Sequence, residues 1–197
     1  MSTGLGAAML RAPVAPGSRV LVVGAGGVGR AVLLGALTRG AVRTIAYDID
    51  GAKARGAVEL GLASDALDSP DELVEQVLEL SDGRGVDYAY DAVGAPGTLE
   101  LALHATRPGG EVVVIGHMRE EVVARIDTRQ LLRQKRVTGT FGGSITPHRH
   151  IPEFVEMHRS GRFDLSRLID ARYRLEEIGQ GFEDLRRGRI GRGAIVF

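Results

Sequence analysis

The sequence predicts an α/β protein with a doubly wound, six-stranded parallel sheet, followed by a short C-terminal strand–helix–strand appendage. Two observations support this fold class. Short apolar runs rich in β-branched residues alternate with segments of helical periodicity as far as residue 141, and this alternation favours right-handed crossovers in a parallel sheet. The first apolar run, residues 19–23, leads into a glycine-rich turn and an apolar helix, an order typical of the first unit of a doubly wound domain.

The expected strands and helices follow one another in a regular order. The strands of the sheet are expected at 19–23, 44–48, 64–67, 85–91, 111–115 and 137–141, and the helices at about 6–10, 31–37, 51–60, 70–80, 96–106, 127–134 and 151–159. Ser69 and Glu72 predict a capping box for the helix that begins at Pro70. Beyond residue 161 we expect a strand near 171–173, a helix at 175–187 and a last strand at 194–197. The chain thus divides into an opening helix and turn (1–18), a sheet domain (19–160) and a C-terminal segment (161–197).

The composition excludes several classes of protein. The chain of 197 residues carries 25 basic and 25 acidic side chains, and this balance argues against general attraction to nucleic acids or membranes. The absence of cysteine excludes disulfides, iron–sulfur clusters and thiolate zinc sites within these residues. No apolar run approaches the roughly 20 residues of a membrane span, and the first residues do not resemble a signal peptide. We expect a cytoplasmic protein that binds neither nucleic acid nor membrane.

The glycine-rich turn, residues 24–29, has the pattern G-x-G-x-x-G between a strand and a helix. In such a turn Gly24 permits the tight bend, Gly26 lets the backbone approach a pyrophosphate, and Gly29 lets the helix pack closely on the strand. The free N–H groups and the dipole of the new helix then face the phosphates. The sequence therefore predicts a dinucleotide-binding turn, although a glycine-rich turn that binds nothing is the simpler alternative.

An acidic residue follows the turn at the expected distance. Asp48 closes the second strand, about 20 residues beyond the turn, where the adenosine ribose lies in a doubly wound domain. Its carboxylate can accept hydrogen bonds from both ribose hydroxyls and would repel a 2′-phosphate, which favours NAD over NADP. Lys53 and Arg55 lie one helical turn further on, and their positive charges could screen a 2′-phosphate, so use of NADP stays open. Asp50 is better placed than Asp48 to cap the following helix.

Other polar clusters give no further site. His148 and His150 are two residues apart, a spacing that one helix face cannot present, so polar histidines near a helix start are favoured over metal ligands. The basic run 186–192 lacks interleaved aromatic residues and suits the last turn of a helix, and only Arg192 is kept as a candidate. Asp91 ends a strand and suits a structural cap as well as it suits catalysis. The sequence thus predicts no catalytic residue and no metal ligand in this chain.

Several motifs in the same order resemble the zinc-containing medium-chain alcohol dehydrogenases, whose cofactor domain is a Rossmann fold. The resemblance runs from Ser2 to Phe197. Its most specific stretches are Val22-Val-Gly-Ala-Gly-Gly-Val-Gly29, Ala46-Tyr-Asp-Ile-Asp50 with Lys53, Gly85-Val-Asp-Tyr-Ala-Tyr-Asp-Ala-Val-Gly94, Thr140-Phe-Gly-Gly-Ser144, Phe182-Glu-Asp-Leu-Arg-Arg-Gly188 and Gly191-Arg-Gly-Ala-Ile-Val-Phe197.

The resemblance implies a set of NAD-binding residues. The pyrophosphate and adenosine would be lined by Gly24, Gly26, Gly27, Val28 and Gly29. Asp48, with Lys53 beside it, would bind the adenosine ribose, and Arg192 would reach the pyrophosphate. The resemblance places Val93 and Gly94 under the cofactor. It places the nicotinamide half against Thr3, Ile115, Gly116 and Phe141.

The resemblance also implies what this chain lacks. Members of the family carry an N-terminal catalytic domain whose Cys and His residues hold zinc, and five histidines without cysteine cannot rebuild that site. We therefore expect the NAD-binding half of an enzyme that transfers hydride between NAD and an alcohol or aldehyde, with zinc only in the absent domain and with no activity in the isolated chain. A stand-alone dinucleotide-binding module is one alternative. An S-adenosylmethionine-dependent methyltransferase is another, although the third glycine of the turn counts against it.

The last strand of the sheet predicts a homodimer. The run Val137-Thr-Gly-Thr-Phe141 would end the sheet with unpaired backbone groups and without a proline to block pairing. The family resemblance implies the same edge-to-edge pairing of cofactor domains. In the alternative interpretation, Arg133 and Lys135 protect an edge that faces solvent.

Overall fold

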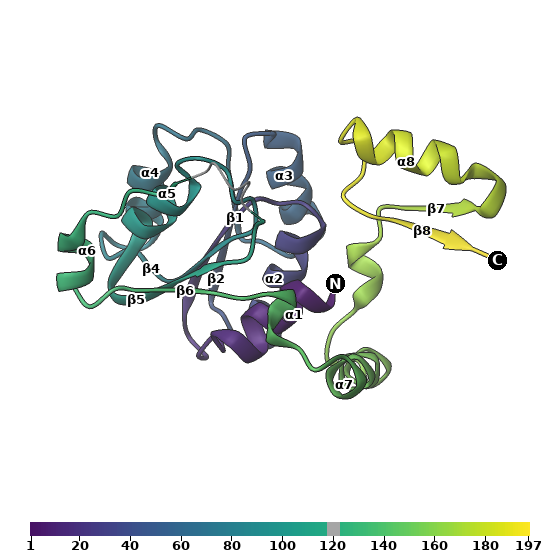
Figure 1. Ribbon diagram of the computed structural model, residues 1–197, viewed down its shortest axis with the longest axis horizontal. Helices are drawn as coiled ribbons and strands as arrows, with labels where there is room; N and C mark the ends of the chain where they lie inside the picture. Colours follow the sequence, from purple (N-terminus) through teal and green to yellow (C-terminus); the bar gives the residue numbers. More distant parts are fainter. Residues whose placement is uncertain (118–122) are drawn as a thin grey trace.

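The computed structural model describes residues 1–117 and 123–197, and a parallel sheet occupies its centre (Figure 1). Its six strands lie in the order β3-β2-β1-β4-β5-β6, and every neighbouring pair is parallel. The strands are β1 (Arg19–Val23), β2 (Arg43–Tyr47), β3 (Asp65–Leu67), β4 (Val86–Asp91), β5 (Thr106–Val114) and β6 (Arg136–Gly139). This order confirms the predicted doubly wound sheet.

Helices cover both faces of the sheet. They are α1 (Ser2–Gly6), which continues into the π-helical turn η1 (Ala7–Arg11), α2 (Gly27–Thr38), α3 (Gly51–Glu59), α4 (Leu73–Leu80), α5 (Thr98–Ala105), α6 (Thr128–Leu132) and α7 (Pro147–Arg159). Short 3-10 turns occur at η2 (Gly142–Ser144) and η3 (Leu165–Leu168). Among the described residues, none of the helices is both long enough and apolar enough to cross a lipid bilayer.

Strand β1 connects the two halves of the hydrophobic core. Val20 and Val22 pack with buried residues of α1, α2 and α3, whereas Leu21 and Val23 pack with those of α4 and α5. Successive side chains of a strand point to opposite faces, and a parallel sheet covered on both faces has no polar side. This explains why the strand is apolar throughout rather than alternating, and all four residues are fully buried.

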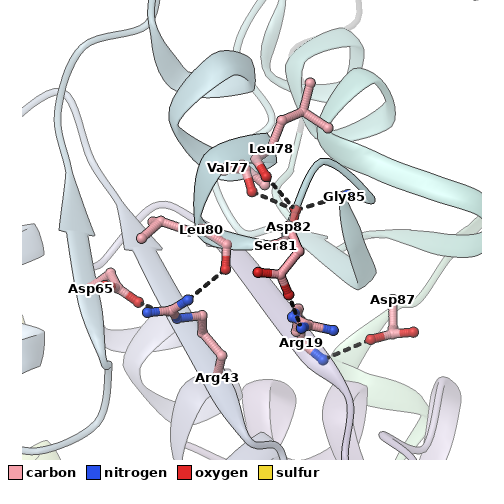
Figure 2. A network of polar contacts seen from close by, with 10 residues as sticks. All are labelled: Arg19, Arg43, Asp65, Val77, Leu78, Leu80, Ser81, Asp82, Gly85 and Asp87. Atoms are coloured by element: carbon pink, nitrogen blue, oxygen red, sulfur yellow. Dashed lines mark hydrogen bonds and ion pairs between the residues drawn. The ribbon is translucent and has the colours of Figure 1, made fainter.

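Ion pairs tie together the amino ends of the strands (Figure 2). The Arg19 guanidinium lies 2.7 Å from the Asp82 carboxylate, and the Arg19 amide donates to Asp87. Arg43 lies 3.0 Å from Asp65 and also donates to the last carbonyl of α4. Arg107 pairs with the other oxygen of Asp87. We call this group the amino-edge cluster; its members are Arg19, Arg43, Asp65, Asp82, Asp87 and Arg107.

Two helix caps agree with the sequence, and the predicted capping box does not. Asp50 accepts a hydrogen bond from the Ala52 amide at the start of α3, and Asp127 caps α6 in the same way. Helix α4 begins only at Leu73, and Pro70 to Glu72 form a turn. The Glu72 carboxylate bonds the Gln76 side chain one turn further on instead of reaching back toward Ser69. The capping box on Ser69 was therefore a wrong prediction.

Strands β5 and β6 also differ from their expected bounds. Strand β5 begins at Thr106 because the backbone pairs with Val86 before it bulges over the Pro-Gly-Gly segment and resumes pairing at Glu111. Strand β6 ends at Gly139 and lies at the edge of the sheet. Lys135 does not protect that edge, since it is only 5% exposed and donates from Nζ to the Leu103 carbonyl at the end of α5.

The C-terminal segment forms the expected strand–helix–strand unit. Strands β7 (Ala171–Arg174) and β8 (Gly193–Val196) pair in parallel, and they are joined through η4 (Leu175–Glu177) and α8 (Ile178–Arg186). In Figure 1 this unit stands beside α2 and α3, apart from the large sheet. One side of it is an apolar hollow lined by Tyr173, Ile178, Gly181, Phe182, Leu185, Gly193 and Ile195.

Candidate functional site

The glycine-rich turn joins β1 to α2 at the carboxyl edge of the sheet. Gly24 has a φ of +95°, a conformation that side chains rarely adopt. A Cβ on Gly29 would collide with the Gly24 carbonyl and lie 3.1 Å from a methyl of Val22, so only glycine lets the helix start this close to the strand. The bend and the close packing expected of these two glycines are thus both present.

Gly26 differs from the other two glycines because the space around it is open. A Cβ on Gly26 would meet no atom of the described residues within 4 Å. Gly26 is the N-cap of α2, which within the described part of the chain has no side-chain cap. Gly27 and Val28 follow in the first turn of the helix and are half-buried. Uncapped N–H groups at a helix start, facing open space, are the elements of an anion site.

Asp48 lies directly beside this turn. One of its carboxylate oxygens accepts from the Ala25 amide at 2.9 Å, and the other accepts from the Asp50 amide at 3.0 Å. These two bonds fix the plane of the carboxylate between the glycine-rich turn and α3. Lys53 stands beside it, and its Nζ lies 3.5 Å from the carboxylate of Asp50 rather than at Asp48.

The ends of β4 and β5 meet on the other side of the turn. A Cβ on Gly24 would be 2.5 Å from a methyl of Val93, which is half-exposed. Gly94 and Gly116 approach each other backbone to backbone, so a Cβ on Gly94 would lie 2.8 Å from the Gly116 carbonyl. Ile115, just before Gly116, donates its amide to the Asp91 carbonyl. The predicted residues of these two strands therefore lie together.

Asp91 holds this arrangement and is structural. It is fully buried, and it accepts hydrogen bonds from the amides of Val93 and Gly94 and from the Thr98 hydroxyl, at 3.0, 3.0 and 2.7 Å. All of these donors belong to the turn after β4 and the start of α5. Of the two interpretations that the sequence allowed, the structural cap is the one that the contacts describe.

Thr3 and Phe141 occupy a neighbouring loop. The backbone of Thr3 in α1 packs against Gly143, and a Cβ on Gly143 would clash with it. Phe141 immediately precedes Gly142 and is 95% exposed. Helix α1 in turn contacts the start of α2, because a Cβ on Gly4 would clash with the Val28 carbonyl. Thr3 is thus tied to the site through α1, whereas the Phe141 ring projects outward.

Arg192 reaches the glycine-rich turn from the far end of the chain. Its Nη2 donates to the Gly27 carbonyl at 3.2 Å across 165 positions of sequence. Its Nε is buried and has no hydrogen-bond partner among the described residues. The structure therefore brings the predicted arginine to the start of α2.

Two residues of this region, Arg30 and Asp170, were not predicted from the sequence. Arg30 in α2 is only 8% exposed, donates from Nε to the Ala25 carbonyl, and pairs with Asp170. The other oxygen of Asp170 accepts from the amides of Gly191 and Arg192, at 2.7 and 2.8 Å. The signal was an arginine in an otherwise apolar helix segment, since a buried charge requires a partner.

The described residues do not provide a metal site. No group of three or more His, Cys, Asp or Glu side chains within 1–117 and 123–197 could hold a metal ion. His150 accepts from the Thr146 amide, and His158 lies near the Leu165 amide, so both rings have local structural partners. The described residues therefore do not provide the set of ligands that a zinc centre needs.

Comparisons with known proteins agree with this geometry. The family model described as zinc-binding dehydrogenase matches residues 27–159. The chain is 33% identical to geraniol dehydrogenase of Castellaniella defragrans over all of its length and 53% of that protein. It is 34% identical to the NDMA-dependent alcohol dehydrogenase of Amycolatopsis methanolica, over 98% of the chain and 53% of the relative.

A solved structure is likewise similar to this chain over about half of its own length. The crystal structure of benzyl alcohol dehydrogenase from Acinetobacter calcoaceticus superposes with a TM-score of 0.91 at 32% identity. That match covers 98% of this chain and 53% of the other. The chain thus spans about half the length of the relatives it matches.

Proposed function

Since the chain belongs to the zinc-binding dehydrogenase family, we propose that its glycine-rich turn binds NAD. We further propose that this NAD exchanges a hydride with an alcohol or aldehyde in an enzyme of its relatives' length. One observation carries the proposal: a helix start that the described residues leave open and without a side-chain cap, a fixed carboxylate and an arginine converge at one edge of the sheet. These three features match the pyrophosphate and ribose of a dinucleotide.

Each feature has a distinct task in the proposal. The first N–H groups of α2 and the Arg192 guanidinium stabilise the two pyrophosphate charges. Asp48 accepts hydrogen bonds from the adenosine ribose. The nicotinamide half lies along Val93, Gly94, Ile115 and Gly116, toward Thr3 and Phe141. Bound NAD supplies the hydride acceptor, and the protein positions it and shapes its surroundings.

The charges around the ribose position favour NAD over NADP. A 2′-phosphate would meet the Asp48 carboxylate, whose plane is fixed by two amide bonds. Lys53 is 3.5 Å from Asp50, and Arg55 is 3.4 Å from Asp68, so each cation already has a carboxylate partner. A phosphate would have to compete with those carboxylates for a cation.

A binding titration with the 197-residue chain tests the proposal. We expect NADH to bind, NADPH to bind more weakly, and S-adenosylmethionine to bind no better than adenosine. Saturation by S-adenosylmethionine without NADH binding would favour a methyltransferase. NADH binding with no turnover by an enzyme of full relative length would favour a binding module without catalysis.

The proposal extends to activity, location and assembly. We propose that the isolated chain binds no zinc and oxidises no alcohol, and that zinc resides in the other half of the enzyme. Elemental analysis and an activity assay would test both statements. The location is proposed as cytoplasmic, with no nucleic-acid or membrane partner, which cell fractionation would test.

A homodimer through β6 is also part of the proposal. Strand β6 ends the sheet and pairs with β5 alone among the described strands, which leaves its second edge available. Val137 and Gly139 belong to this strand, and Phe141 follows it. Light scattering at micromolar concentration should give twice the chain mass, and a monomer would contradict the dimer.

A further inference from the structure

We infer that the partly buried Arg30–Asp170 pair positions Arg192 for the pyrophosphate, which makes Arg30 and Asp170 positioning residues of the cofactor site. The inference rests on the proposed function, because it concerns how this same site holds its anion. It adds two side chains that the sequence did not predict, Arg30 and Asp170. Their effect is transmitted through the backbone of residues 191–192.

Arg30 links the glycine-rich turn to Asp170. It lies in the first turns of α2, with a side chain only 9% exposed. Its Nε donates to the Ala25 carbonyl inside the glycine-rich turn at 3.1 Å. The guanidinium thus bonds the turn with one nitrogen and Asp170 with another, so a movement of the turn and a movement of Asp170 are coupled.

Asp170 links Arg30 to the backbone of residues 191–192. It stands between η3 and β7, and one carboxylate oxygen pairs with Arg30. The second oxygen accepts both the Gly191 and the Arg192 amides, and the Asp170 amide donates to the Arg192 carbonyl. The backbone on both sides of the Arg192 α-carbon is therefore held by one aspartate.

This arrangement orients the Arg192 side chain before a ligand arrives. With its backbone held, the guanidinium reaches the Gly27 carbonyl at 3.2 Å, beside the first turn of α2. One of the five N–H donors of an arginine is used there, and Nε stays buried without a partner among the described residues. Preorganisation of this kind lowers the ordering cost of binding.

The pair also balances charge at an anion site. A lone carboxylate this close to the start of α2 would repel a pyrophosphate, and the Arg30 guanidinium neutralises it. Removing one partner of this partly buried ion pair leaves the other charge uncompensated. Loss of Asp170 therefore frees the segment that carries Arg192, and loss of Arg30 exposes the phosphates to a negative charge.

The test compares two probes that differ in the pyrophosphate. ADP-ribose carries it and adenosine does not, so only ADP-ribose senses the position of Arg192. In the 197-residue chain we expect Asp170→Ala to weaken ADP-ribose binding about tenfold, the equivalent of one charge-assisted contact. Adenosine binding should change less than about twofold. Equal losses for the two probes would show a general structural defect and would overturn the inference.

A matched control and a second variant complete the design. Asp87 has the same side-chain exposure as Asp170, 20%, and lies at the opposite edge of the sheet. Like Asp170 it pairs with one arginine, and it accepts from one backbone amide where Asp170 accepts from two. Asp87→Ala should leave the affinity for both probes unchanged in the folded chain. If Asp170→Ala fails to fold, Asp170→Asn carries the test, with a smaller loss confined to ADP-ribose.

A double-mutant cycle tests whether Asp170 acts on the ligand through Arg192. If Asp170 acts through Arg192, Asp170→Ala adds nothing to the loss already caused by Arg192→Ala. Additive losses, or unchanged ADP-ribose affinity in Asp170→Ala, would overturn the inference while leaving NAD binding intact. Failure of the unaltered chain to bind NADH and ADP-ribose would instead overturn the proposed function and this inference together.

Discussion

At the amino ends of the central strands, arginine and aspartate side chains neutralise one another, whereas at their carboxyl ends glycines leave backbone and space uncovered. The amino-edge cluster pairs Arg19 with Asp82 and Arg43 with Asp65. At the carboxyl edge Gly26 has open space around it, and α2 starts without a side-chain cap among the described residues. Polar groups that are satisfied internally serve stability, and polar groups left without partners are available to a ligand.

Both edges contain arginine–aspartate pairs, but the pairs at the two edges connect different parts of the chain. Those of the amino-edge cluster connect the starts of neighbouring strands to one another and to the segment after the end of α4 (Figure 2). Arg30 and Asp170 connect the glycine-rich turn to a segment 140 positions away in the sequence. An ion pair indicates function only where it positions a group toward unfilled space, and the following experiments test that distinction.

The largest effect should come from Gly29→Ala. The added methyl group would collide with the Gly24 backbone carbonyl, which cannot move without displacing the turn. We expect a loss of about 3 kcal/mol or more in unfolding free energy, measured by urea denaturation. Gly26→Ala is the matched control, since its methyl group meets open space. It should leave stability within about 0.5 kcal/mol yet weaken NADH binding.

Lys135 tests whether the amino edge tolerates a buried cation that has no carboxylate partner in the described part of the chain. Burial lowers the pKa of Lys135 to about 8. The unfolded chain keeps this proton up to about pH 10.4, so between these values it binds more protons than the folded chain. The unfolding free energy should therefore rise with pH from about 8 to 10, by about 2 kcal/mol relative to Lys135→Met. Parallel pH profiles of the two proteins would contradict this.

Asp48→Ala should alter cofactor preference more than stability. The substitution removes the acceptor of the ribose hydroxyls and the charge that repels a 2′-phosphate. A hydrogen bond to a charged group is worth about 1.5–3 kcal/mol, so the preference for NADH over NADPH should fall by about tenfold or more. Fluorescence titration with both nucleotides measures it. Equal affinities in the unaltered chain would contradict the assigned role of Asp48.

The smallest effect should come from Asp82→Asn in the amino-edge cluster. The Asp82 side chain is 77% exposed, and an exposed ion pair contributes less than about 1 kcal/mol. Asparagine also tolerates the left-handed φ of 56° at this position. Thermal unfolding should shift slightly and NADH affinity should stay the same. A marked loss of affinity would mean that the two edges are coupled.

The parts of the fold that sequence predicted well are those set by local pattern. The apolar runs and the glycines of β1 and α2 appear as expected, because burial on both faces and close helix packing each demand a narrow set of residue types. The capping box at Ser69 failed because Glu72 had another partner in Gln76. A local motif does not reveal which of two local hydrogen bonds is formed.

The candidate site was predicted in part for a similar reason. Asp48 and Arg192 follow from spacing and from resemblance, and both lie at the turn. Arg30 and Asp170 were missed, because their meeting depends on how the C-terminal segment docks on α2. No periodicity encodes a contact between residues 140 positions apart. The same applies to Lys135, which a charge pattern alone assigns to the surface.

The bond between Arg192 and Gly27 also sets an order of events during synthesis. Domains generally fold as units while the chain is still being made, and every strand of the large sheet has been translated once Gly139 is in place. Arg192 is added only after α7, β7 and α8. A nascent chain can therefore complete its sheet well before the start of α2 acquires its arginine. Stabilisation by a bound dinucleotide, which requires the finished site, becomes available only after Arg192 has been added.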